Sequence, residues 1–104
     1  MTTGKNKENF EKWFRLNFHW TIEDAGDGTY FNALPFEMQI GVYLSYYDSI
    51  GYRIGIDCYY DMQGTYRTDF VDKDNKVHGF QSKDMDTAYK EAFKKADELI
   101  NQQN

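Results

Sequence analysis

Two consecutive stretches of the chain alternate between apolar and outward-facing residues, and only four residues separate them. Residues 36–47 place every second side chain on one face, and residues 52–61 repeat the pattern. Because successive side chains of a strand point to opposite faces, this period of two predicts a long antiparallel β-hairpin with its turn at residues 48–51. Its inward side would consist of Phe36, Met38, Ile40, Val42, Leu44, Ile54, Ile56 and Cys58.

Helices are expected on both sides of this hairpin in the sequence. Residues 7–18 and 84–101 carry apolar side chains at helical spacing opposite charged ones. Residues 65–71 predict a third strand, and residues 76–80 predict a short continuation or a fourth strand. The sequence therefore predicts an α+β two-layer sandwich with the order helix, three or four antiparallel strands, helix.

The length of the chain suits one domain. With 104 residues, of which 40% are hydrophobic and 18% aromatic, the chain can bury a core without disulfides or a structural metal. We expect a single domain over residues 1–104, with residues 1–5 and 102–104 frayed. Residues 19–35 do not follow one period, so the sequence does not define the role of this segment as a whole.

Charge and cysteine content limit the classes of partner and compartment. Lys and Arg number 12 against 17 Asp and Glu, so the formal net charge is -5. An acidic domain repels a phosphate backbone at long range, which disfavours nucleic acid as a partner. A lone cysteine, Cys58, with no signal-like start and no long apolar run, predicts a cytoplasmic protein that neither enters a membrane nor is secreted.

The patterns that usually accompany catalysis are weak in this chain. The two histidines, His19 and His78, do not form part of a metal-ligand cluster, and no glycine-rich run leads into a helix. Residues 72–75 are typical of a polar hairpin turn more than of a calcium loop. Asp57 and Asp61 share one predicted strand face near Tyr59, which leaves acid–base chemistry as an alternative. We predict a protein that is not an enzyme and that has no cofactor or metal.

The order of helix, three strands and helix resembles that of the double-stranded RNA-binding domain, and the alanine-rich residues 88–96 resemble its last helix. The resemblance implies an RNA-binding module as an alternative function. That family meets RNA phosphates with lysines at the start of the last helix, where this chain has Asp84 and Asp86. The resemblance therefore concerns the order of the helices and strands and does not extend to the residues that bind RNA.

Residues 34–44 and 46–51 resemble a segment of small uncharacterised phage and prophage proteins of gut bacteria. The segment covers less than a fifth of the chain. This resemblance implies an accessory protein that works in a bacterial host. It also implies a protein partner, such as a host nucleic-acid-handling or defence enzyme that the accessory protein inhibits.

The remaining face of the predicted hairpin is the candidate partner surface. Tyr and Arg provide contact area and directed hydrogen bonds, and carboxylates set an electrostatic preference. The sequence thus predicts an acidic protein-binding module, with a homodimer that pairs exposed strands as the structural alternative. The candidate residues are Tyr43, Tyr47, Arg53, Asp57, Tyr59 and Asp61, supplemented by Glu37 and by the acidic loop residues Glu23, Asp24 and Asp27.

Overall fold

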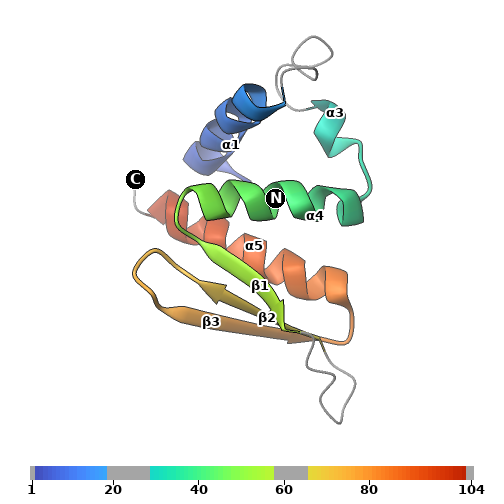
Figure 1. The fold of residues 1–104 in the computed structure, drawn as a ribbon, viewed down its shortest axis with the longest axis vertical. Coiled ribbons are helices and arrows are strands. Elements are labelled where there is room, and N and C mark those ends of the chain that lie inside the picture. The colour runs from blue at the N-terminus through green and yellow to red at the C-terminus, as the bar shows by residue number, and fades with distance from the viewer. Residues whose placement is uncertain (1, 19–28, 58–65, 103–104) are drawn as a thin grey trace.

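A computed structural model describes residues 2–18, 29–57 and 66–102 (Figure 1). The described part of the chain combines helices with one antiparallel sheet, so the predicted α+β class, with its helix, three antiparallel strands and helix, is confirmed. The elements are α1 (Gly4–Asn17), α3 (Thr29–Asn32), α4 (Phe36–Ser49), β1 (Arg53–Asp57), β2 (Tyr66–Val71), β3 (Val77–Ser82) and α5 (Met85–Gln102).

The sheet has the strand order β1-β2-β3, and both strand pairs are antiparallel. Phe70 of β2 lies between Ile54 of β1 and His78 of β3 in the register. Phe70 and Thr68 are fully buried on the side that α5 covers. Strands β2 and β3 confirm the strands predicted at residues 65–71 and 76–80. The strand predicted at residues 52–61 is confirmed over the residues that the structure describes, where it forms β1.

The prediction of a first hairpin strand at residues 36–47 is wrong, because residues 36–49 form helix α4. The side chains buried from this segment are Ile40, Tyr43, Tyr46 and Tyr47, which recur at helical spacing. Met38, predicted to face the core, is 62% exposed. Most residues of the segment are apolar or aromatic, so one sequence satisfies both a period of two and a period of 3.6.

The start of α4 carries signals that favour the helix. Pro35 occupies the N-cap position, where its restricted φ of -55° and missing N–H cost nothing, and Glu37 lies in the first turn. The Gln39 side chain donates hydrogen bonds to the carbonyls of Leu34 (2.8 Å) and Phe31 (3.2 Å). These bonds hold the preceding turn and α3 against the first turn of α4.

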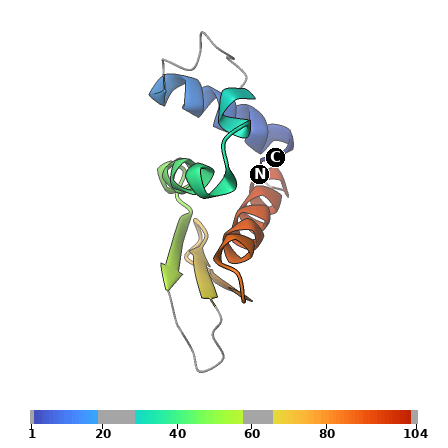
Figure 2. The same ribbon diagram turned by 90° about the vertical axis from the view of Figure 1, so that its right-hand side faces the viewer.

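Helix α5 covers one face of the sheet, whereas α4 and α1 lie beyond one end of the strands (Figures 1 and 2). Helix α5 packs on β2 and β3, α4 leads directly into β1, and α1 packs on α4 and α5 at a greater distance from the sheet. No described helix covers the opposite face of the sheet. The core between the helices is mainly aromatic: Phe10, Phe14, Phe31, Tyr43, Tyr46, Tyr47, Tyr89 and Phe93.

A buried polar network fixes the start of α1 to the end of α5. Asp97 accepts hydrogen bonds from the Thr3 backbone N–H (2.8 Å) and from Asn6 Nδ2 (2.8 Å). Asn6 Nδ2 also donates to the Tyr47 hydroxyl (3.2 Å), and Asn6 Oδ1 accepts from the Tyr46 hydroxyl (2.6 Å). Because buried polar groups are costly without partners, these bonds fix the position of α1 relative to α4 and α5.

Gly41 offers a test of α4. A Cβ at Gly41 meets no atom within 4 Å, and glycine in a helix interior costs about 1 kcal/mol relative to alanine. Gly41→Ala is therefore expected to raise the free energy of unfolding by about 0.5–1 kcal/mol in urea denaturation. Gly51→Ala is the control and is expected to lower the free energy of unfolding, because φ at Gly51 is 92° and a side chain there is strained. Equal effects of the two substitutions would contradict the helix.

Candidate functional site

The two tyrosines predicted for the partner surface lie in the core. Tyr43 is 1% exposed and Tyr47 is fully buried, so neither belongs to a free surface. Their rings pack against Phe93 of α5, at centroid distances of 5.2 and 5.7 Å. The strand prediction placed them outward, whereas the helix turns them toward α5.

The other predicted residues are divided among separate regions. Glu37 is exposed in the first turn of α4, and Arg53 is exposed at the start of β1. Asp57 is the last residue of β1. The structure therefore does not bring Glu37 and Arg53 together. The positions of Tyr59, Asp61, Glu23, Asp24 and Asp27 lie outside the described residues.

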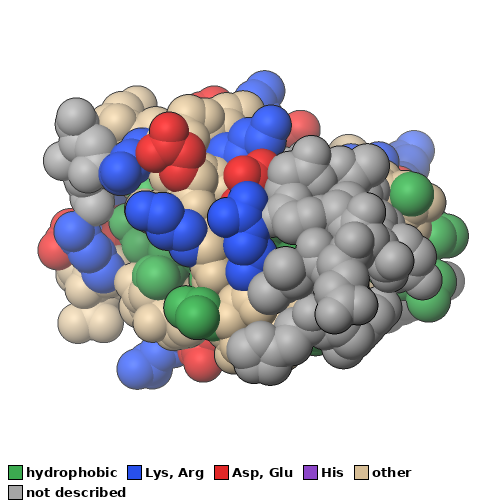
Figure 3. All heavy atoms as spheres, turned by 90° about the horizontal axis from the view of Figure 1, so that it is seen from above, with side chains coloured by type: hydrophobic (Ala, Val, Ile, Leu, Met, Phe, Trp, Pro, Cys, Tyr) green, Lys and Arg blue, Asp and Glu red, His purple; other side chains and the backbone are tan. Residues whose placement is uncertain are grey.

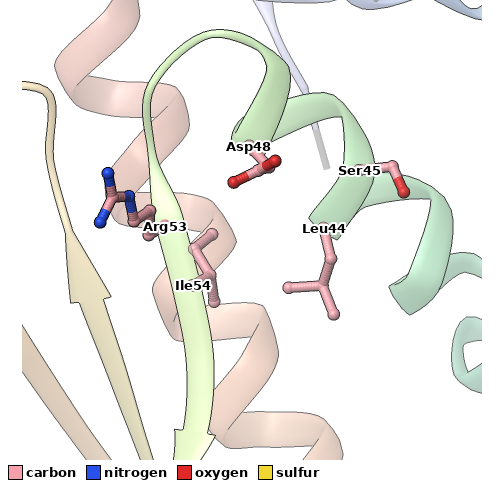
Figure 4. Close-up of a pocket in the computed structure, with 5 residues that line it drawn as sticks. All are labelled: Leu44, Ser45, Asp48, Arg53 and Ile54. Carbon is pink, nitrogen blue, oxygen red and sulfur yellow. The ribbon is translucent and has the colours of Figure 1, made fainter.

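An open depression lies between α4 and β1 (Figure 4). Its volume is about 370 Å³, and it is lined by Leu44, Ser45, Asp48, Arg53 and Ile54. The half-buried side chains of Leu44 and Ile54 form its apolar part. Asp48 points its carboxylate toward β1, while the Arg53 guanidinium extends to the other side of the strand. We call this feature the α4–β1 depression.

Asp48 has a position that helix stability does not explain. It lies in the last turn of α4, where the negative end of the helix dipole disfavours a carboxylate, and that turn contains no basic residue. Within the described residues, the Asp48 carboxylate forms no ion pair. Asp48 is therefore an exposed charge that opposes the helix dipole and has no ion-pair partner among the described residues.

The depression adjoins a strand that has one free edge. Strand β1 is the first in the order β1-β2-β3, so within the described part of the chain it pairs with β2 on one side only. Helix α5 packs mainly on β2 and β3, which leaves Ile54 of β1 half-buried. An edge strand presents unpaired backbone N–H and C=O groups that can bond another chain.

A group of carboxylates lies where α4 and α5 begin. The hydrogen bond between Glu37 and Asp86 raises the pKa of Asp86, while a backbone hydrogen bond and the Asp86 contact lower that of Glu37. Lys90 lies 4.9 Å from the centroid of the Phe36 ring. Asp84 accepts from the Thr87 N–H (3.1 Å) and caps α5. These contacts join the first turns of α4 and α5, so we assign this group of carboxylates a structural role.

The turn between β2 and β3 has the predicted polar character. Asp72 Oδ1 accepts from the N–H groups of Asp74 (2.9 Å) and Lys76 (3.0 Å), and Asp72 Oδ2 lies 3.1 Å from His78 Nε2. The backbone bond from Lys76 and the His78 contact lower the pKa of Asp72. The carboxylate thus stabilises the turn and keeps His78 in place.

Among the described residues, the basic side chains of α5 and of the sheet do not converge on one face. Lys90 and Lys94 are exposed on α5, whereas Arg67 lies on the opposite face of the sheet and binds Asp69 (3.0 Å).

Another basic group, which the sequence pattern does not indicate, lies on α1. Figure 3 looks down on this end and shows Lys and Arg side chains with acidic ones among them. The exposed basic residues of α1 are Lys5, Lys7, Lys12 and Arg15.

Comparisons with protein-family models, with curated proteins and with solved structures returned no match. The resemblances to phage proteins and to the double-stranded RNA-binding domain therefore stay predictions. No described helix is long and apolar enough to cross a membrane. The described side chains include no group of three or more His, Cys, Asp or Glu residues that could hold a metal ion.

The buried tyrosines predict a distinct alkaline titration. Burial raises the pKa of Tyr43 and of Tyr46 to about 12 and also raises the pKa of Tyr47. An unfolded tyrosine ionises near pH 10, so the stability from these groups is complete below about pH 10 and is lost as the pH rises toward 12. Tyrosinate absorbance should therefore show these rings ionising above the exposed ones, together with unfolding.

A titration in denaturant is the control, because every tyrosine should then ionise near pH 10. If all nine tyrosines of the folded chain ionised together near pH 10, with circular dichroism unchanged, the burial of Tyr43 and Tyr47 would be contradicted.

Proposed function

We propose that this protein is a binding module for another protein and that it meets its partner at the α4–β1 depression and the free edge of β1. The observation that carries the proposal is the Asp48 carboxylate, which has no ion-pair partner among the described residues and lies against the helix dipole beside an apolar surface. Apolar area next to a directed charge is what protein interfaces use for affinity and for partner choice.

The charge of this region supports a basic partner. From residue 29 to residue 52 the charged residues are Glu37 and Asp48, with no Lys or Arg. Helix α4 therefore carries one carboxylate in its first turn and one in its last turn, with no basic residue between them. A partner surface with Lys or Arg beside an apolar side chain would complement both the charge and the floor of the depression.

Affinity capture with matched variants tests the proposal. Immobilised wild-type protein, Asp48→Lys and Glu98→Lys would each be incubated with a bacterial lysate, because the phage resemblance predicts a bacterial host. Both substitutions replace an exposed acid near a helix C-terminus by a base, but Glu98 does not line the depression. We expect a partner that wild type and Glu98→Lys retain and Asp48→Lys loses.

Stability measurements complete this test. Lysine is favourable at a helix C-terminus, so Asp48→Lys is expected to be at least as stable as wild type in urea denaturation. Loss of capture without loss of stability would assign Asp48 to binding. Capture of the same proteins by Asp48→Lys, or no specific capture by wild type, would contradict the proposal.

The hypothesis of an inhibitor concerns the identity of the partner. If the captured protein acts on nucleic acid, its activity should fall on addition of wild type and remain on addition of Asp48→Lys. A captured protein of another class would support protein binding and contradict this narrower hypothesis.

A further inference from the structure

We infer that the partner contributes an extended strand that pairs with the free edge of β1 and carries basic and apolar side chains on one face and acidic ones on the other. This inference deepens the proposed function and rests on it. It assigns the mode of binding and the chemistry of the bound segment, which the proposed function leaves open.

The backbone of β1 favours a strand as the occupant. Residues 53–57 pair with β2 through one edge, and no described strand pairs with the other edge. The α4–β1 depression opens beside this edge, so a strand added there would pass over it (Figure 4). Strand addition supplies affinity through main-chain hydrogen bonds and specificity through pockets for alternate side chains.

The two faces of β1 predict an alternating pattern in the added strand. Ile54 faces the depression with Leu44 and Asp48, whereas the Arg53 guanidinium lies on the other side of β1. Side chains of the added strand alternate in the same way. Those facing the depression would place an apolar group on Ile54 and Leu44 and a Lys or Arg near Asp48.

Side chains on the other face of the added strand would lie beside Arg53 and Gly55. A Cβ at Gly55 would meet no atom within 4 Å, so no side chain covers the backbone at this part of the sheet surface. Arg53 forms no ion pair within the described residues and is exposed. An Asp or Glu one position from the apolar residue would complement the guanidinium.

Strand pairing is favoured over a helix as the occupant by the shape of the site. The depression is short, being lined by two residues of β1 and three of α4, and it is open. A docked helix needs a long groove for side chains on successive turns. A strand needs one pocket and the adjacent edge, which is what this side of the molecule provides.

Selection from a displayed library of random linear peptides is the experiment. Binders to wild type should share alternating Lys or Arg and large apolar residues on one face, with Asp or Glu between them. Their affinity should fall about tenfold or more for Asp48→Lys and stay within about twofold for Glu98→Lys. Selected peptides that lack this pattern, or that bind Asp48→Lys equally well, would overturn the inference.

Hydrogen exchange locates the bound strand. Alternate amides within residues 53–57 should exchange rapidly in the free protein and become protected when a selected peptide is added. Protection of β3 alone, or of no strand, would overturn strand pairing at β1. If protein capture still depended on Asp48 in that case, the proposed function would stand without this mode of binding.

A second copy of the chain is the competing occupant of the edge. Light scattering that shows a dimer, together with protection of β1 amides before any peptide is added, would overturn the inference in favour of self-pairing. A monomer with unprotected β1 amides would support it.

Discussion

Asp97→Ala is expected to lower the free energy of unfolding by about 3 kcal/mol, which is a large fraction of the roughly 5–15 kcal/mol that stabilises a typical domain. Asp97 is only 7% exposed, and its carboxylate accepts hydrogen bonds from Thr3 and Asn6. Removing the acceptor leaves the buried Asn6 amide without one of its bonds and the start of α1 without its anion. A hydrogen bond to a charged group contributes about 1.5–3 kcal/mol.

Urea denaturation followed by circular dichroism measures this effect. Glu98→Ala is the matched control, because Glu98 is the next residue on α5 and is exposed, so a change within about 0.5 kcal/mol is expected. Asp97→Asn keeps the size of the side chain and one acceptor oxygen, so its loss should be intermediate. If Asp97→Ala and Glu98→Ala had equal effects, the network would not hold α1 in place.

Tyr47→Ala is expected to cost about 3–5 kcal/mol, the usual cost of removing a buried aromatic side chain. Tyr47 is fully buried in α4. Its ring lies near those of Tyr46, Tyr52 and Phe93, at centroid distances of 5.1, 6.5 and 5.7 Å. An alanine there leaves a cavity between α4 and α5 that the surrounding rings cannot fill.

The same substitution distinguishes a helix at residues 36–49 from the strand that the sequence predicts there. On the outer face of a strand, Tyr47→Ala would change the stability by about 0.5 kcal/mol or less. Ser45→Ala is the control on the exposed side of α4. Tyr47→Phe isolates the hydroxyl, which accepts from Asn6 Nδ2, and should cost about 1 kcal/mol. An effect of Tyr47→Ala as small as that of Ser45→Ala would contradict the burial of this ring.

The candidate site was only partly predictable. Arg53 was selected from the sequence, and it does border the α4–β1 depression. The period of two predicts Asp48 in a hairpin turn and Leu44 on the inner face of a strand, and neither position suggests a shared site. A carboxylate in the last turn of a helix is unusual only once the helix is known, so its meaning depended on the assignment of α4.

The helices α1 and α5 and the strands β2 and β3 were determined by the sequence itself. In α5, Ala88, Ala92 and Ala96 recur on one face while Lys90 and Lys94 lie on another, and no strand pattern fits these positions. In β2, Thr68 and Phe70 alternate with Arg67 and Asp69. Where apolar and charged residues alternate clearly, only one period places the charges in water.

Beyond the helix-start signals at Pro35 and Glu37, the tertiary structure decided residues 36–49. Between Glu37 and Asp48 the segment has no charged residue, so neither period buries a charge and the local pattern cannot choose between them. The helix prevails because it turns Tyr43 and Tyr47 together onto Phe93 and brings the Tyr46 and Tyr47 hydroxyls to Asn6. Those contacts join residues far apart in the chain, and no local period contains them.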